Sequence, residues 1–251
     1  MSFAIYNQLY FQRFRNIILH SLTQGNTHLV GFYRLDDVSG LNDSSSCGNS
    51  RGFENDTTLS PGYMGEPDTA YRFRGTPSSY VRLPNNGTFK SNSMTLLTWF
   101  KAETLTGQQT IWQFSNEGSL AFLLALHVNK LQLDLYPNCD ENVLSFSPSV
   151  TLQTSTWYFI GISYYHSTGS IHFWVRGTDG AQHYKFFWAG FVELETHHDI
   201  WLGYGPESPG AFNGSIACVQ IYSAWLREDE ITDAQKKCLP RQWSGRCERF
   251  E

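Results

Sequence analysis

The sequence predicts an all-β fold, a two-sheet antiparallel sandwich with one short C-terminal helix. Three observations predict it. About a dozen short segments have strand-like patterns, turn residues separate them at intervals of about 8–12 residues, and strands do not alternate with helices. Short strands separated by turns are typical of sandwiches, whereas a parallel α/β sheet needs a helix between successive strands.

The strand signals extend from residue 29 to residue 222. The clearest is Lys130–Leu135, where polar and apolar residues alternate with the period of a half-buried strand. Segment 120–126 is apolar in both phases, which is typical of a central strand that is covered on both faces. The expected strands are 29–35, 70–73, 80–83, 94–101, 110–114, 120–127, 130–135, 143–146, 157–165, 170–176, 183–188, 200–204 and 215–222.

One helix is expected at 228–238, because Ile231, Ala234 and Cys238 are spaced to form one apolar face. Acidic residues at its start and Lys236 and Lys237 at its end complement the helix dipole. The polar segment 36–69 is expected to be a single long loop, and loops of that length are usually functional or disordered.

The composition supports one large core. The chain has 251 residues, 16% of them aromatic and 16% charged, which disfavours disorder. A formal net charge of −5 with scattered Lys and Arg gives no footprint for nucleic acid. The chain contains no run of about 18 apolar residues, so no transmembrane segment is predicted.

We expect one domain at residues 28–238, with a C-terminal tail at 239–251. Residues 1–27 form an extension outside the domain, which is either helical or a truncated leader. Its apolar stretch is too short for the core of a signal peptide. If the protein is extracellular, we therefore expect the N-terminus of this sequence to be truncated or mis-started.

Five blocks of sequence occur in an order that resembles a known family. They are 30–35 followed by Asp43-Ser44, 70–75 with 79–85, 94–100, 157–164, and 212–222 leading through Leu226 to Glu230-Ile231. Together they resemble the laminin G-like and concanavalin A-like jelly roll, a pentraxin-related group, over residues 28–238. Two positions depart from the family pattern: Arg227 replaces a capping Ser or Thr, and Ala217 replaces an Asp of calcium-binding relatives.

The resemblance implies a secreted or cell-surface recognition or adhesion module. Its partner would be a glycan or an extracellular protein, and the oligomeric state stays open. The alternative is a glycosidase on the same sandwich, which needs two carboxylates on one strand face. The nearest matches, 193–195 and 228–230, do not complete the Glu-x-Asp-x-(x)-Glu pattern, so we expect no catalytic residues.

The residues suggest two candidate sites. His172 and Trp174 lie in the strand phase opposite to Ile171, Phe173 and Val175, so they are candidates for stacking on a sugar or anchoring a protein. The alternative is burial under a second layer.

Asp43, next to Asn42, is a candidate calcium ligand, with an Asx-turn as the alternative. Calcium is the one cofactor that the residues suggest. The run 197–199, His-His-Asp, is expected to be a surface loop, because adjacent residues of an extended chain point to opposite faces.

Cysteines and sequons bear on the compartment. Of the five cysteines, Cys218 and Cys238 are expected to form a disulfide, because a short connection folds the helix back beside the last strand. Cys238 with Cys247 is the rival pair, and the states of Cys47 and Cys139 stay open. Sequons at Asn42, Asn55, Asn86 and Asn213, all in stretches expected to be loops, favour N-glycosylation in the secretory pathway.

Overall fold

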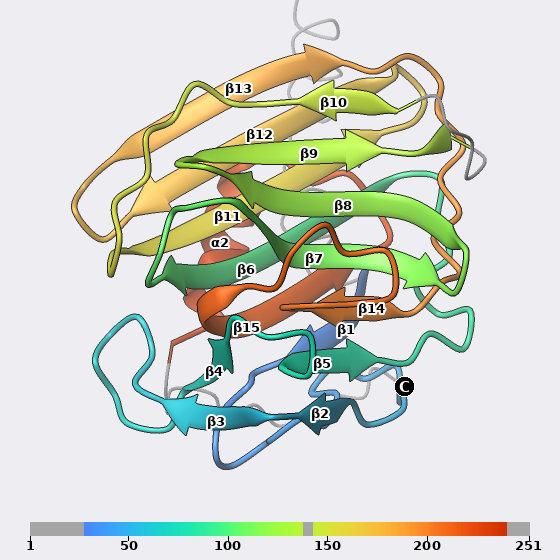
Figure 1. Ribbon diagram of the computed structural model, residues 1–251. Coiled ribbons are helices and arrows are strands. Elements are labelled where there is room, and N and C mark those ends of the chain that lie inside the picture. The colour runs from blue at the N-terminus through green and yellow to red at the C-terminus, as the bar shows by residue number, and fades with distance from the viewer. Residues whose placement is uncertain (1–27, 138–142, 240–251) are drawn as a thin grey trace, which may run out of the picture.

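The computed structural model describes residues 28–137 and 143–239 as two facing antiparallel sheets (Figure 1), which confirms the predicted jelly-roll sandwich. Residues 1–27, most of the tail and Cys139 lie outside the described residues. The 8-stranded sheet has the order β13 (Gln182–Trp188), β12 (Ser170–Gly177), β11 (Trp157–Tyr165), β6 (Met94–Ala102), β15 (Asn213–Tyr222), β4 (Ala70–Arg74) and β3 (Thr57–Ser60), with β1 (Leu29–Tyr33) also paired to β15. The 7-stranded sheet has the order β10 (Leu144–Phe146), β9 (Lys130–Leu135), β8 (Ser119–His127), β7 (Gln108–Asn116), β14 (Ile200–Leu202), β5 (Tyr80–Leu83) and β2 (Phe53–Asn55).

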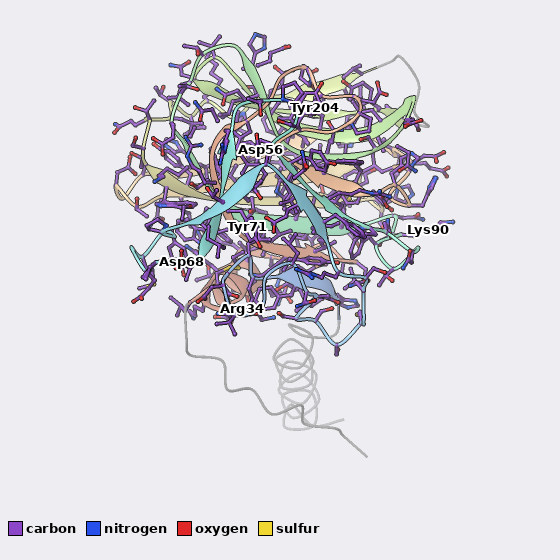
Figure 2. All side chains as sticks on the ribbon, turned by 60° about the horizontal axis from the view of Figure 1, so that its bottom comes forward. Arg34, Asp56, Asp68, Tyr71, Lys90 and Tyr204 are labelled. Carbon is purple, nitrogen blue, oxygen red and sulfur yellow. A yellow bond between two sulfur atoms is a disulfide. The ribbon has the colours of Figure 1, made fainter. Side chains whose placement is uncertain are left out.

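Two of these strands were not expected. β2 and β3 lie within the segment 36–69, so the prediction of a single loop there is wrong. Asp56, labelled in Figure 2, lies between them. Its backbone is left-handed, with φ 47°. The chain bends there and passes from one sheet to the other, because β2 pairs with β5 and β3 pairs with β4.

Two apolar cores are present. The larger lies between the sheets and includes Trp112, Phe122 and Val219. The smaller, which we call the outer core, lies on the outer face of the 8-stranded sheet and joins Trp99 and Phe159 to Ile231 of α2 (Glu228–Lys236). The helix lies behind this sheet in Figure 1. Some of the large buried side chains of the 8-stranded sheet therefore pack under the helix and not between the sheets.

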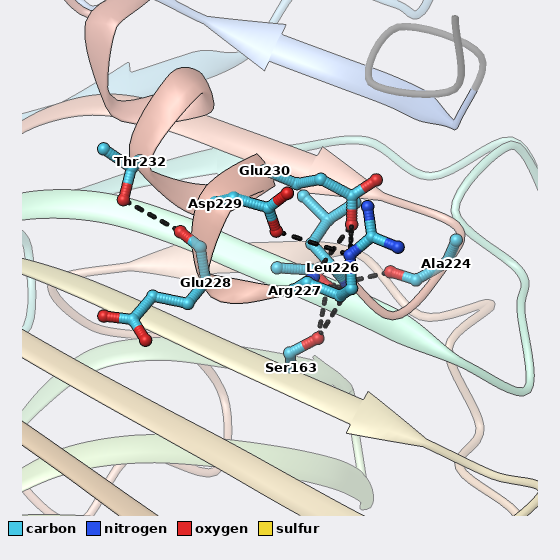
Figure 3. A network of polar contacts seen from close by, with 9 residues as sticks. Ser163, Ala224, Leu226, Arg227, Glu228, Asp229, Glu230 and Thr232 are labelled. Atoms are coloured by element: carbon cyan, nitrogen blue, oxygen red, sulfur yellow. Dashed lines mark hydrogen bonds and ion pairs between the residues drawn. The ribbon is translucent and has the colours of Figure 1, made fainter. Parts of the chain in front are cut away.

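A small polar network attaches the start of α2 to the sheet (Figure 3). The N–H of Leu226 donates to the hydroxyl oxygens of Thr95 and Ser163, at 3.0 and 2.9 Å. Arginine has no acceptor with which to cap a helix, and the Arg227 side chain makes no capping hydrogen bond. The Glu230 carboxylate compensates in part by accepting a hydrogen bond from the N–H of Arg227 at 2.9 Å.

The end of α2 is attached by the predicted disulfide. Cys218 and Cys238 are bonded, with a Cα–Cα distance of 5.6 Å. The register between β15 and β6 shifts between Ala217 and Gln220, and Cys218 has a positive φ of 51°. Because of this bulge, Ala217 and Cys218 both pack in the outer core, next to α2. Cys238 is thus unavailable to Cys247, which lies outside the described residues.

The helix itself is short. Within the described part of the chain, no helix is long and apolar enough to cross a membrane.

Candidate functional site

Aromatic side chains gather on the outer face of β12 and β13, beside α2. In the register of these strands, His172 lies opposite Phe186, and Trp174 lies opposite Tyr184. Directly opposed residues share a face of the sheet, so their side chains form one surface. We call it the outer aromatic surface, and it consists of His172, Trp174, Tyr184, Phe186, Trp188 and Trp225.

The exposed part of this surface is not the predicted one. Trp174 is only 3% exposed and packs in the outer core, so the alternative of burial under a second layer holds for it. His172 is half-buried and stacks on Trp174 with a centroid distance of 5.6 Å. The exposed rings belong to β13: Tyr184, Phe186 and Trp188 are 54%, 51% and 68% exposed. Their alternation with His183 and Lys185 was the available signal, because it places three aromatic rings on one strand face.

Contacts hold these rings in place before any ligand binds. His172 Nδ1 and the Tyr184 hydroxyl share a hydrogen bond of 2.8 Å, and the Phe186 ring packs edge-on against His172 at 5.3 Å. The indole N–H of Trp188 donates to the carbonyl of Thr168 at 3.1 Å. Burial lowers the pKa of His172, so its imidazole is neutral at neutral pH and the surface carries no charge at that point.

The other phase of β13 is also exposed in part. His183 and Lys185 lie opposite Val175 and Phe173, residues of the core between the sheets, yet both are exposed. Phe187 contacts Phe146 of β10 with a centroid distance of 5.3 Å. β13 is thus an edge strand whose inner phase is covered at one end only.

Asp43 is surrounded by hydrogen-bond donors. Its Oδ1 accepts from the main-chain N–H groups of Phe32 and Ser45, each at 2.9 Å. Its Oδ2 accepts from the Ser45 hydroxyl at 2.7 Å and from the main-chain and side-chain N–H groups of Asn49, at 3.1 and 2.8 Å. The hydrogen bond from the Ser45 N–H to Asp43 is that of the Asx-turn alternative, and Phe32 and Asn49 add further donors to the same carboxylate. A calcium ion at Asp43 would have to displace these donors.

The histidines before β14 lie closer together than expected. Residues 196–198 form a turn and not an extended chain, so the imidazole rings of His197 and His198 are only 4.3 Å apart between centroids. One ligand atom from each of Glu195, His197 and His198 lies within 4.8 Å of the other two. Asp199 is not part of this group, because its carboxylate pairs with Arg82 at 2.6 Å. The prediction that adjacent histidines point apart is therefore wrong.

The acidic runs considered for glycosidase chemistry do not form a pair in a cleft. Glu193 is exposed, Glu195 lies 3.3 Å from His197, and the run 228–230 is the first turn of α2. Among the described residues, the buried acids are Asp36 and Asp134, and each has a donor partner: Arg34 at 2.7 Å and Gln132 at 2.9 Å.

The four sequons differ in accessibility. Asn42, Asn55 and Asn86 are exposed, but Asn55 ends β2 and is not in a loop. Asn213 begins β15, is half-buried, and accepts a hydrogen bond from Arg72 at 2.9 Å through its Oδ1. The prediction of four loop positions is thus wrong for two of them.

We expect glycans at Asn42, Asn55 and Asn86 and little or none at Asn213 when the chain is secreted with a complete export signal. The reason is that transfer needs an accessible side-chain amide, and Asn213 is half-buried, with its Oδ1 held by Arg72. Peptide mapping by mass spectrometry after secretion gives the occupancy of each site. Main occupancy at Asn213 would contradict the expectation.

A family model described as the concanavalin A-like lectin/glucanases superfamily matches residues 74–232. No curated protein sequence matches the chain.

Several solved structures have the same fold. The receptor binding domain of botulinum neurotoxin mosaic serotype C/D aligns with a TM-score of 0.64 at 17% identity, over 84% of this chain and 51% of that chain. Domain 4 of an extracellular arabinanase from Geobacillus stearothermophilus, in complex with arabinotriose, aligns with a TM-score of 0.59 at 18% identity, over 82% and 98% of the two chains. The ligand binding domain of botulinum neurotoxin serotype D, in complex with N-acetylneuraminic acid, aligns with a TM-score of 0.64 at 14% identity, over 84% and 51%. The chain thus spans about half the length of the toxin domains, and at these identities the likeness shows the fold alone.

Proposed function

This chain belongs to the concanavalin A-like lectin/glucanase superfamily, and we propose that it is an extracellular recognition module that binds a glycan through its outer aromatic surface, without catalysis. One observation carries the proposal: Tyr184, Phe186 and Trp188 are large, exposed and aligned on one face of an edge strand. Soluble proteins rarely leave such patches exposed without a partner.

The chemistry of the surface favours a saccharide. A sugar ring has a face of C–H groups that packs on an aromatic ring, and hydroxyls at its edge that need polar partners. The Tyr184 hydroxyl and the His172 imidazole are polar groups that lie among the rings. Two similar structures hold a saccharide, arabinotriose in one and N-acetylneuraminic acid in the other, which supports this ligand class.

Two further observations support the rest of the proposal. The disulfide and the three exposed sequons are typical of proteins that pass through an oxidising compartment. The buried acids have donor partners, and the acidic runs considered for catalysis pair with His197 or lie in the first turn of α2, which favours binding over hydrolysis.

A glycan array with the secreted protein, run with and without calcium, would identify the ligand, and calorimetry would give its affinity. We expect Trp188→Ala and Phe186→Ala each to weaken binding about tenfold, or about 1.4 kcal/mol, because each removes a stacking ring. Phe53→Ala is the matched control, since Phe53 is 60% exposed but lies on β2 of the other sheet.

Four outcomes would contradict the proposal. Unchanged affinity in both β13 variants, or an equal loss in Phe53→Ala, would place the glycan elsewhere. No retained glycan, together with a protein partner captured through Trp188, would make the surface a protein-binding site. Release of shorter saccharides from the bound glycan, detected by mass spectrometry, would support the glycosidase alternative.

A further inference from the structure

We propose that Glu195, His197 and His198 form a binding site for a divalent transition-metal ion, and that Zn²⁺ is the ion that fits it best. The site goes beyond the proposed function. It lies in the turn before β14 and contacts the β7–β8 hairpin, through Asn116 and Ser119.

The distances are close to those of a metal site. In tetrahedral zinc sites, metal–ligand bonds of about 2.0–2.2 Å place neighbouring ligand atoms about 3.3–3.5 Å apart. Glu195 Oε2 and His197 Nδ1 are already 3.3 Å apart, and all three ligand atoms lie within 4.8 Å of one another. Glu195 and His197 are half-exposed, so rotation of their side chains can close the remaining gap to His198, which is at most about 1.5 Å.

The ligand types select the ion. Two imidazoles and one carboxylate are a common set for Zn²⁺, whereas Ca²⁺ and Mg²⁺ prefer oxygen ligands only. Three protein ligands leave a fourth position, which water or a group of a bound ligand can take.

Surrounding contacts hold the turn in the required shape. The side-chain amide of Asn85 donates to the carbonyls of Thr196 and His198, at 2.6 and 3.0 Å. On the far side, the Asp199 carboxylate accepts the main-chain N–H of Asn85 at 2.8 Å and pairs with Arg82. The backbone that carries both histidines is therefore anchored before and after them.

His198 is oriented by its neighbours. Its Nδ1 lies 3.0 Å from Asn116 Nδ2, and its Nε2 lies 2.9 Å from the Ser119 hydroxyl. A metal ion bound at Nδ1 would replace Asn116, and the protonated Nε2 would donate to the Ser119 hydroxyl. Partners of this kind fix the orientation of metal-bound histidines in other proteins.

The test uses the full chain without a polyhistidine tag, after treatment with a chelator. Titration with ZnCl₂ in a calorimeter should show one site per chain, and Co²⁺ should give the visible absorption of a tetrahedral complex. His197→Ala and Glu195→Gln should each weaken Zn²⁺ binding at least about tenfold, because each loses one of three ligands. His183→Ala, which removes an exposed histidine of β13, is the control and should bind like the wild type.

The proposal is overturned by either of two results. One is no binding by the wild type at Zn²⁺ concentrations up to about 100 μM. The other is wild-type affinity in both His197→Ala and Glu195→Gln. The thermal midpoint of each variant without metal confirms that it is folded, and both substitutions are at half-exposed side chains.

Discussion

The Cys218→Ala variant is expected to be less stable than the wild type by about 3 kcal/mol in its free energy of unfolding. The two cysteines are separated by 20 residues, and opening a loop of that length restores much of the freedom of the unfolded chain. The bond also joins β15 to the end of α2, which covers the outer core. Cys238→Ala should lose a similar amount.

Urea unfolding followed by tryptophan fluorescence measures this loss. A reducing agent added to the wild type should lower its midpoint to that of the variants, because it removes the same bond. Cys47→Ala is the control, since Cys47 is exposed and forms no disulfide within the described residues. Equal midpoints for the wild type and Cys218→Ala would show that the bond contributes nothing to stability.

Asp43→Ala is expected to cost about as much, near 3 kcal/mol, because hydrogen bonds to a charged acceptor are stronger than neutral ones. The change removes a carboxylate that accepts five hydrogen bonds from Phe32, Ser45 and Asn49. Asp43→Asn should also destabilise, since its amide N–H₂ would face donors. Ser46→Ala, at an exposed position of the same loop, should leave the urea midpoint unchanged.

Calcium tests the other interpretation of Asp43. Because its oxygens already accept protein donors, we expect millimolar calcium to leave the thermal midpoint of the wild type unchanged. A rise of several degrees that disappears in Asp43→Asn would instead identify Asp43 as a calcium ligand.

The strand pattern predicted the sandwich well where strands are apolar on at least one face. It failed for β2 and β3, because both are short and have mostly exposed side chains, so no alternation marks them. Their pairing depends on the bend at Asp56, and a single residue with left-handed backbone leaves no periodic signal.

The disulfide was predicted from the nearness of a strand and the helix that follows it. The side chain of Ile216 lies in the core between the sheets. In a regular strand the side chain of Cys218, two residues later, would point to the same face and away from α2. The bulge in β15 reverses this, and sequence alone gave no sign of it.

The outer aromatic surface was predicted only in part, because segments far away in the sequence decide which of its side chains are exposed. Trp174 is in the predicted phase, yet α2 and the neighbouring rings bury it. The proximity of His197 and His198 depends on a turn that Asn85, more than a hundred residues earlier, holds in place.

The exposed inner phase of β13 has a consequence for the behaviour of the protein at high concentration. An edge strand has unpaired N–H and C=O groups that can template the addition of a strand from a second copy. Lys185 and His183 lie at that edge on the side facing the other sheet. If a strand of a second copy paired with β13, its side chains would bury the Lys185 ammonium. Burial of a charge is costly without a counter-charge. The protein can therefore display aromatic rings on one side of its edge strand while the other side protects it from aggregation.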